Sequence, residues 1–149
     1  MGNTEYKNTE DLLEQLKMKN MSYEDWLGDN EDSFIQRDLA QFWHIAVEES
    51  GISKTDISNR ANLGWTYLYD ILKGKKIPSR DTIVRLFLAM QLGSEKCQEA
   101  LKMNNWAVLY PKIKRDSVLL YALNHKLSMS ETETLLKQQQ ETALKKTNE

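Results

Sequence analysis

Residues 53–79 read SKTDISNRANLGWTYLYDILKGKKIPS, and this stretch predicts two short helices joined by a tight Asn-Leu-Gly turn. Ser53 is placed to cap the first helix, because its hydroxyl can accept a hydrogen bond from the free amides of the first turn. The second helix is expected over residues 65–72, where leucine and isoleucine recur at helical spacing. Gly74 ends that helix and Pro78 prevents it from resuming.

Charge is distributed unevenly along the 149 residues, whose net charge is −2. Residues 1–33 contain nine acidic residues and three lysines, a net charge of −6. Residues 51–80 contain six basic and two acidic residues, a net charge of +4. Affinity for a phosphate backbone depends on where lysine and arginine cluster, so the local charge of residues 51–80 favours a nucleic-acid partner.

Several other classes of protein are disfavoured. No apolar run approaches the roughly 18 to 20 residues that span a bilayer, and the polar start does not resemble a secretion signal, so we expect no membrane contact and a cytoplasmic location. Cys97 is the only cysteine, which excludes an intrachain disulfide and a cysteine metal cluster. His44 and His125 are the only histidines, and no catalytic or phosphate-binding motif occurs. We therefore expect no enzyme activity, no metal and no cofactor.

Helical periodicity runs along the chain and no segment alternates with period two, so an all-α fold is expected. The predicted parts are an acidic helical arm over residues 1–33, a core domain over residues 34–104, a helical hairpin packed on it over residues 105–140, and a frayed tail over residues 141–149. The core domain should begin with a long helix from Phe34 to Ser50.

The second half of the chain contains an internal echo. The segment RDTIVRLFLAMQLGSEKCQEALK begins at Arg80, and RDSVLLYALNHKLSMSETETLLK begins at Arg115, an offset of 35 residues. Each copy predicts a helix, a short turn and a second helix, so we expect two stacked helical hairpins. In the second copy, Ser130 and Glu133 are the expected capping box of the last helix.

The stretch around the turn resembles the helix-turn-helix of the phage-repressor (Cro-like, Xre-type) family. The matching positions are Ile57, Ser58, Leu63, Leu68, Ile71, Gly74, Lys75, Lys76 and Pro78. The later Arg-Asp pairs and the Leu-Tyr-Pro at residues 109–111 are also similar to a group of small regulator-like proteins of clostridial-type bacteria. The first resemblance implies a five-helix-type helix-turn-helix core whose second helix enters the major groove of double-stranded DNA. It also implies a homodimer, because one such helix covers only a few base pairs.

The resemblance assigns roles to residues when it is carried over position by position. The implied base contacts are Trp65, Thr66 and Tyr69. The implied phosphate contacts are Lys54, Lys73, Lys75, Lys76 and Arg80. The start of the second helix departs from the family, which usually has Arg, Gln, Asn or Ser there. Indole and phenol groups can pack on a thymine methyl or bond to a phosphate, but they lack the two-pronged hydrogen bonding that reads guanine or adenine.

Three alternatives stay open. An aromatic helix end is also typical of a protein-binding surface, because Trp and Tyr are enriched at contact hot spots, so a non-catalytic protein-interaction adaptor built on the same fold is the main rival. Trp65 and one of the tyrosines could instead be core or interface residues. The acidic arm could compete with DNA for the second helix, or it could be a solvated amphipathic segment.

Overall fold

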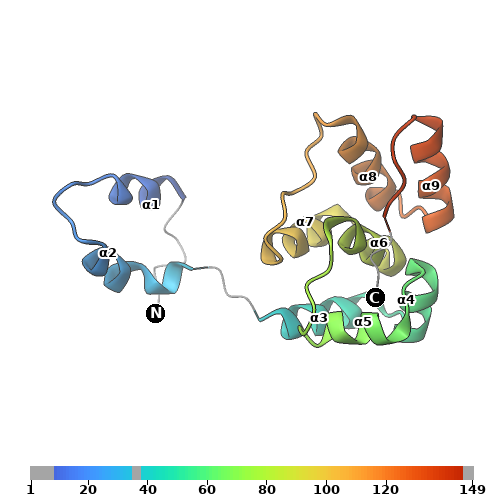
Figure 1. Ribbon diagram of the computed structural model, residues 1–149, viewed down its shortest axis with the longest axis horizontal. Helices are drawn as coiled ribbons and strands as arrows, with labels where there is room; N and C mark the ends of the chain where they lie inside the picture. The colour runs from blue at the N-terminus through green and yellow to red at the C-terminus, as the bar shows by residue number, and fades with distance from the viewer. Residues whose placement is uncertain (1–8, 35–37, 146–149) are drawn as a thin grey trace. The chain divides into compact units, whose positions relative to one another are not determined.

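The computed structural model describes residues 9–34 and 38–145, and over these residues it contains nine α-helices, one short 3-10 helix and no strand (Figure 1). The expected all-α fold is thus confirmed. Contacts divide the chain into two compact units, Met1–Arg37 and Asp38–Glu149. The boundary therefore lies four residues beyond the end of the predicted arm.

The smaller unit contains α1 (Thr9–Leu16), α2 (Tyr23–Asn30) and the 3-10 helix η2 (Glu31–Ser33). Ser22 caps α2, because its hydroxyl accepts a hydrogen bond from the amide of Asp25 at 3.1 Å. The buried Asn30 joins the two helices: its side-chain amide donates to Gln15 Oε1 at 3.1 Å and to the carbonyl of Trp26 at 2.9 Å. Trp26 and Asn30 are the buried residues in the described part of this unit, so its core is small.

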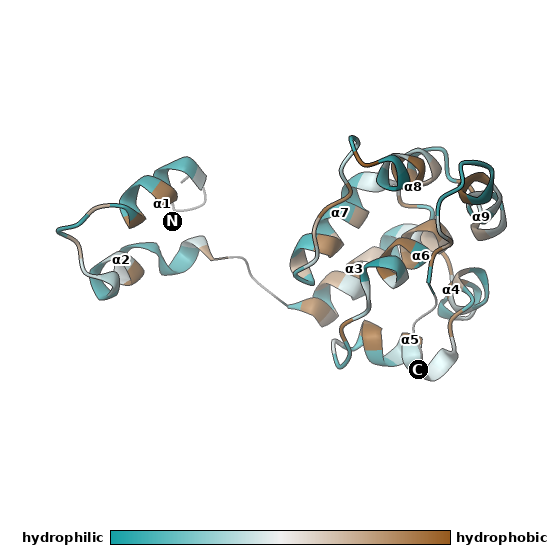
Figure 2. Cartoon of the chain, turned by 45° about the horizontal axis from the view of Figure 1, so that its top comes forward, coloured by the Kyte–Doolittle hydropathy of each residue, from teal (hydrophilic) through white to brown (hydrophobic). Residues whose placement is uncertain are grey.

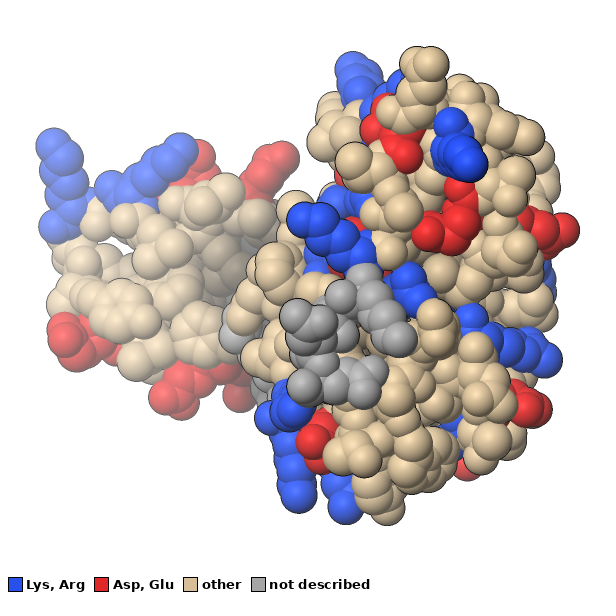
Figure 3. All heavy atoms as spheres, turned by 45° about the vertical axis from the view of Figure 1, so that its right-hand side comes forward, with Lys and Arg blue, Asp and Glu red and all other residues tan. Residues whose placement is uncertain are grey.

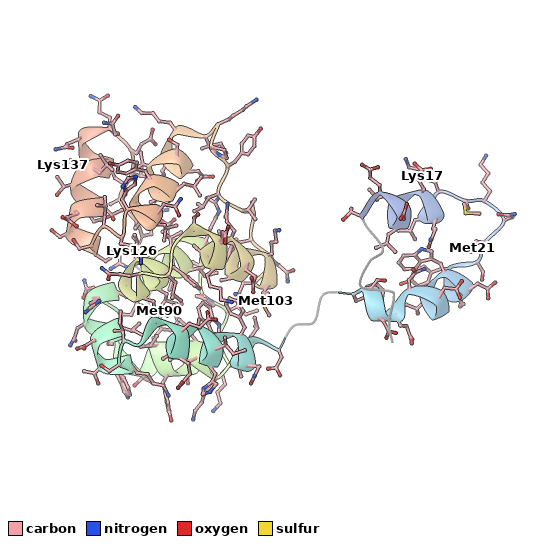
Figure 4. The ribbon with its side chains drawn as sticks, turned by 180° about the vertical axis from the view of Figure 1, so that it is seen from behind. Lys17, Met21, Met90, Met103, Lys126 and Lys137 are labelled. Atoms are coloured by element: carbon pink, nitrogen blue, oxygen red, sulfur yellow. The ribbon has the colours of Figure 1, made fainter. Side chains whose placement is uncertain are left out.

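The larger unit is built around one buried helix. Its helices are α3 (Leu39–Ser50), α4 (Lys54–Ala61), α5 (Trp65–Leu72), α6 (Arg80–Met90), α7 (Ser94–Met103), α8 (Lys114–Asn124) and α9 (Met129–Gln138). In Figure 1, α3, α4 and α5 lie on one side of α6, and α8 and α9 lie on the other. Every residue from Thr82 to Met90 is buried, as expected for a helix that is covered all round. Figure 2 shows hydrophobic residues on α3, α5 and α6, and Figure 4 shows Met90 between α6 and the helices below it.

The first helix of the larger unit starts later than predicted. Helix α3 begins at Leu39, not at Phe34, because Asp38 caps it by accepting a hydrogen bond from the amide of Gln41 at 3.0 Å. Phe34 has an extended backbone after η2, and residues 35–37 lie outside the described residues. The end is as predicted: Gly51 adopts a left-handed conformation with φ 67°.

Helix α4 and the turn after it follow the predicted pattern. The hydroxyl of Ser53 accepts a hydrogen bond from the amide of Asp56 at 3.1 Å, which confirms the predicted cap. Asn62 adopts the left-handed conformation, with φ 55°, at the end of the helix. The turn is closed by Ser58, whose hydroxyl donates to the carbonyl of Leu63 at 2.6 Å. Side chains of α4 therefore fix the direction in which the chain enters α5.

Helix α5 has the predicted bounds, Trp65–Leu72, and packs its fully buried Leu68 and Ile71 into the core. Gly74 follows it with φ 76°, a conformation that L side chains rarely adopt. A Cβ atom at Gly74 would also lie 3.3 Å from the backbone nitrogen of Ala40 in α3. Both conformation and space therefore require glycine where the chain leaves α5.

The internal echo is confirmed as two helical hairpins, α6 with α7 and α8 with α9. The bounds of α7 and α9 differ by the same 35 residues as the sequence echo. Left-handed residues also recur at that offset: Gln91 (φ 57°) matches Lys126 (φ 54°), and Asn105 (φ 64°) matches Gln140 (φ 60°). Lys126 is labelled in Figure 4. The two copies share backbone conformation as well as sequence.

The capping box of α9 is two residues earlier than predicted. Ser128 Oγ accepts from the amide of Glu131 at 3.1 Å, and Glu131 Oε1 accepts from the amide of Ser128 at 2.9 Å. The predicted pair, Ser130 and Glu133, has the same spacing but lies inside the helix. Glu133 instead accepts a hydrogen bond from the amide of Leu144 at 3.1 Å. A tertiary contact thus uses the carboxylate that the sequence assigned to the cap.

Two ion pairs join the hairpins reciprocally, and we call the four residues the reciprocal clamp. Arg80 donates to both carboxylate oxygens of Asp116, at 3.1 and 2.9 Å. Arg115 donates to both carboxylate oxygens of Asp81, at 3.1 and 3.0 Å. Each arginine therefore binds the aspartate of the other copy, and both pairs have the two-pronged geometry of strong charge-assisted hydrogen bonds.

The clamp also holds the segment that follows each hairpin. Arg80 donates to the carbonyls of Ala107 and Val108, and Arg115 donates to those of Thr142 and Ala143. The aspartates accept from backbone amides, Asp116 from Tyr110 at 3.0 Å and Asp81 from Lys145 at 2.8 Å. Leu144 is 3% exposed. The prediction of a frayed tail is thus wrong for residues 141–145, because these contacts anchor it; residues 146–149 lie outside the described residues.

Candidate nucleic-acid interface

The outward face of α5 carries the three residues predicted to contact bases. The exposed fractions of Trp65 and Tyr69 are 48% and 39%, and Thr66 is also exposed. Residues four apart lie on one face of a helix, so Trp65 and Tyr69 share the outer face, whereas Tyr67 lies one turn before the buried Ile71 and is itself 4% exposed. Trp65 is therefore not a core residue, whereas Tyr67 is; the alternative that Trp65 is an interface residue stays open.

Trp65 and Tyr69 form a stacked pair, which we call the aromatic pair. Their ring centroids are 5.9 Å apart and the ring planes differ by 14°. Stacked aromatic pairs gain about 0.5–1.5 kcal/mol beyond the area that they bury, and exposure reduces that gain. Each ring thus restricts the rotamers of the other, and the pair presents a preformed surface to any partner.

Two lysines from different helices converge on the ring of Tyr69. Lys73 Nζ lies 4.2 Å from the ring centroid, directly after the end of α5. Lys54 Nζ lies 5.7 Å from the same centroid and belongs to the first turn of α4. A cation above an exposed aromatic ring contributes about 0.5–1 kcal/mol. The two helices thus place positive charge beside the aromatic pair.

The loop after α5 adds Lys75 and Lys76, both exposed. Its backbone is held to α5, because the amide of Lys75 donates to the carbonyl of Asp70 at 2.9 Å. Lys76 Nζ lies 4.0 Å from Asp70 Oδ2 and 5.5 Å from the ring centroid of Tyr67. A surface ion pair of that length contributes little to stability, so Lys76 can exchange it for a phosphate. Figure 3 shows lysine and arginine side chains projecting at the lower edge of the larger unit, the level at which α5 lies in Figure 1.

Arg80, predicted as a phosphate contact, is engaged inside the protein, which disfavours that role. All three nitrogens of its guanidinium donate hydrogen bonds within the protein, to Asp116, Ala107 and Val108. Its place after Pro78 in the sequence matched the pattern of a basic loop, but the partner that binds it is 36 residues further along the chain. Four of the five predicted phosphate contacts, Lys54, Lys73, Lys75 and Lys76, are exposed around α5.

A hollow of about 200 Å³ lies beside Tyr69, between α3, α4 and α5. Its lining includes Trp43, His44 and Glu48 of α3 together with Lys54. Small-molecule sites usually have volumes of about 300–1,000 Å³, so this hollow is small for a ligand. The surface around α5 is better suited to an extended partner than to an enclosed molecule.

Other chemistry at the described residues is limited. Cys97 is fully buried, and burial raises the pKa of its thiol to about 12, although the charge of Arg80 opposes the shift. The thiol is therefore protonated at neutral pH and unreactive. Within residues 9–34 and 38–145, His, Cys, Asp and Glu form no group that could hold a metal ion. The helices of the same residues include none with the length and apolar character needed to cross a bilayer.

No protein-family model, curated protein or solved structure matches this chain. The function must therefore be inferred from the geometry of the site and from the resemblance in its sequence.

Proposed function

We propose that this protein is a DNA-binding transcriptional regulator, in which α4 and α5 form a helix-turn-helix and α5 lies in the major groove of double-stranded DNA. The observation that carries the proposal is the convergence of Lys54 and Lys73 on the exposed ring of Tyr69. A duplex demands cations for its phosphates and exposed side chains for its base edges, and this surface offers both within one helix pair. The sequence resemblance to phage repressors covers the same two helices.

The proposal gives each exposed residue a role. The proposed phosphate contacts are Lys54, Lys73, Lys75 and Lys76, which surround α5. The proposed base contacts are Trp65, Thr66 and Tyr69, because the N-terminal side chains of the second helix point toward base edges in this docking mode. A helix of eight residues reads only a few base pairs, so we propose that the regulator acts in the cytoplasm as a homodimer on paired half-sites.

Salt dependence of binding to duplex DNA tests the proposal. Each phosphate contact releases counterions, so affinity should fall steeply as salt rises, and Lys75→Ala or Lys76→Ala should each reduce the slope of log K against log salt by about 1. Lys137→Ala is the matched control, because Lys137 is exposed at the end of α9 (Figure 4) and should leave the slope unchanged. Equal slopes for all four proteins would contradict the assignment of this surface.

The second candidate function is a non-catalytic protein-interaction adaptor. The observation that favours it is the exposure of Trp65 and Tyr69, since tryptophan and tyrosine are enriched at the energetic centres of protein interfaces. The two candidate functions differ in whether the protein binds duplex DNA. Absence of duplex binding even at low salt would favour the adaptor, in which case Trp65→Ala should weaken the binding of a protein partner by at least tenfold.

A further inference from the structure

The base-facing end of α5 has an unusual chemical composition for a helix in a major groove. Its exposed residues are Trp65, Thr66 and Tyr69, and none carries the guanidinium or amide that reads guanine or adenine in two-pronged fashion. The neighbouring lysine ammonium groups lie against the ring of Tyr69, at 4.2 Å for Lys73 and 5.7 Å for Lys54. Direct hydrogen-bond reading of purines is therefore a minor part of what this helix can do.

The same residues are well suited to apolar contact. The ring centroids of the aromatic pair are 5.9 Å apart and the ring planes differ by 14°, so the two rings form one apolar surface in a fixed position. Thr66 adds a methyl group on the adjoining part of the first turn. Tyrosine and tryptophan have only two side-chain torsions, so little conformational entropy is lost when they contact a partner.

The one apolar group that a base pair presents in the major groove is the C5 methyl of thymine. We infer that α5 selects DNA by contact between the aromatic pair and pyrimidine C5 methyl groups, which makes A·T-rich duplexes the preferred substrate. This inference rests on the proposed DNA-binding function and specifies its substrate. Burial of one methyl group corresponds to about a fourfold gain in affinity.

Removal and addition of that methyl group provide the test. Four duplexes of roughly 20 base pairs are compared, about two helical turns each: alternating A·T, alternating A·U, alternating G·C, and alternating G·C in which cytosine carries a C5 methyl. The inference requires the wild-type protein to bind A·T at least about fourfold more tightly than A·U, and methylated G·C more tightly than plain G·C by a similar factor. The two comparisons differ in DNA shape but share the methyl group, so a shape effect would not give both results.

Variants assign the effect to residues. Trp65→Ala and Tyr69→Ala should each reduce both methyl preferences toward unity, and both side chains are exposed, so the fold should be kept. Lys75→Ala is the matched control: it should weaken binding to all four duplexes alike and preserve both ratios.

Each outcome is decisive. Equal affinities of the wild-type protein for the methylated and unmethylated duplexes, with steep salt dependence on all four, would overturn the methyl inference and leave the DNA-binding proposal standing. Absence of salt-dependent binding to any duplex would overturn both. Methyl preferences that persist in Trp65→Ala and in Tyr69→Ala would also overturn the inference, because another surface would then read the methyl group.

Discussion

Replacing Arg80 with methionine tests whether the reciprocal clamp stabilises the larger unit. Asp116 is 2% exposed in the wild-type protein, and methionine keeps much of the aliphatic side chain but removes the cation, so the carboxylate is left with the amide of Tyr110 as its hydrogen-bond donor. Removing one partner of a buried ion pair costs about 3–5 kcal/mol. Because the side chain of Arg80 is 25% exposed, the lower end applies, and we expect the free energy of unfolding at pH 7 to fall by about 3 kcal/mol.

The loss should depend on pH. Burial raises the pKa of Asp116, but hydrogen bonds from Arg80 and Tyr110 and the charges of Arg80 and Arg115 outweigh burial, so the pKa lies below the ordinary value of 3.8. The wild-type carboxylate thus contributes stability above pH 3.8 that is lost as pH falls through its lowered pKa. Arg80→Met removes two of the four causes that lower the pKa of Asp116 and leaves burial, the largest single cause, in place, so we expect the pKa to be higher in the variant and less stability to be lost on acidification than in the wild type. The deficit should therefore be largest at neutral pH and shrink on acidification.

Urea unfolding, followed by circular dichroism at pH 7 and near pH 4, measures both effects. Lys112→Met is the control, because Lys112 is exposed nearby and should change stability by less than about 0.5 kcal/mol. Arg115→Met removes the equivalent cation of the other pair and should also destabilise the protein. A loss below about 1 kcal/mol in Arg80→Met, or a deficit that does not shrink at low pH, would refute the reasoning. The slope of DNA binding against salt should be unchanged, since the guanidinium of Arg80 is bonded to Asp116 and to two backbone carbonyls.

Three further predictions follow from other parts of the fold. Gly74→Ala should lower the free energy of unfolding by about 1–2 kcal/mol in chemical denaturation, because φ is 76° and the added Cβ meets α3. Gly28→Ala is the control: the residue lies in α2 with open space around it, so the change should be neutral or stabilising. Equal effects of the two substitutions would contradict this reasoning. Cys97 should resist a thiol reagent at pH 8 in the native protein and react fully in urea, so rapid native modification would contradict its raised pKa of about 12 and its burial. A fragment of residues 38–149 should melt at the same temperature as the larger unit does within the full chain, since each unit is compact by itself. It should also bind DNA with the affinity of the full chain. Tighter binding by the fragment would show that the acidic arm is inhibitory.

Local signals in the sequence predicted local structure well. The cap at Ser53, the turn and the bounds of α5 were predictable because short-range hydrogen bonds and helical spacing decide them. The failures came where several local solutions were nearly equal. Asp38 competed with an apolar pattern that starts at Phe34, and Ser128 competed with Ser130 for the same capping geometry. At α9 a tertiary contact uses the alternative carboxylate, because Glu133 accepts a hydrogen bond from the amide of Leu144, and a window of a few residues could not show this.

In the candidate site, too, features set by local spacing were predictable and features set by distant partners were not. Exposure of Trp65 and Tyr69 could have been predicted from their four-residue spacing on the face opposite Ile71, together with the pairing of Tyr67 and Ile71 on the inner face. The internal role of Arg80 was less accessible, because its partners come from the second copy and from the segment between the copies. The 35-residue echo contained the signal, since both copies begin with Arg-Asp, but Arg85 lies four residues after Asp81 in the same helix and offered a local partner for that aspartate.

The crossed pairing of the clamp makes the two hairpins depend on each other. An arginine that bound the aspartate of its own copy would let one copy fold while the other was absent. Here a chain that stopped after residue 113 would strand Arg80 without its acid and Asp81 without its base. Mutual exchange of the same residue pair is also how identical subunits meet across a two-fold axis, so the second half of this chain has the bonding pattern of a dimer joined into one polypeptide.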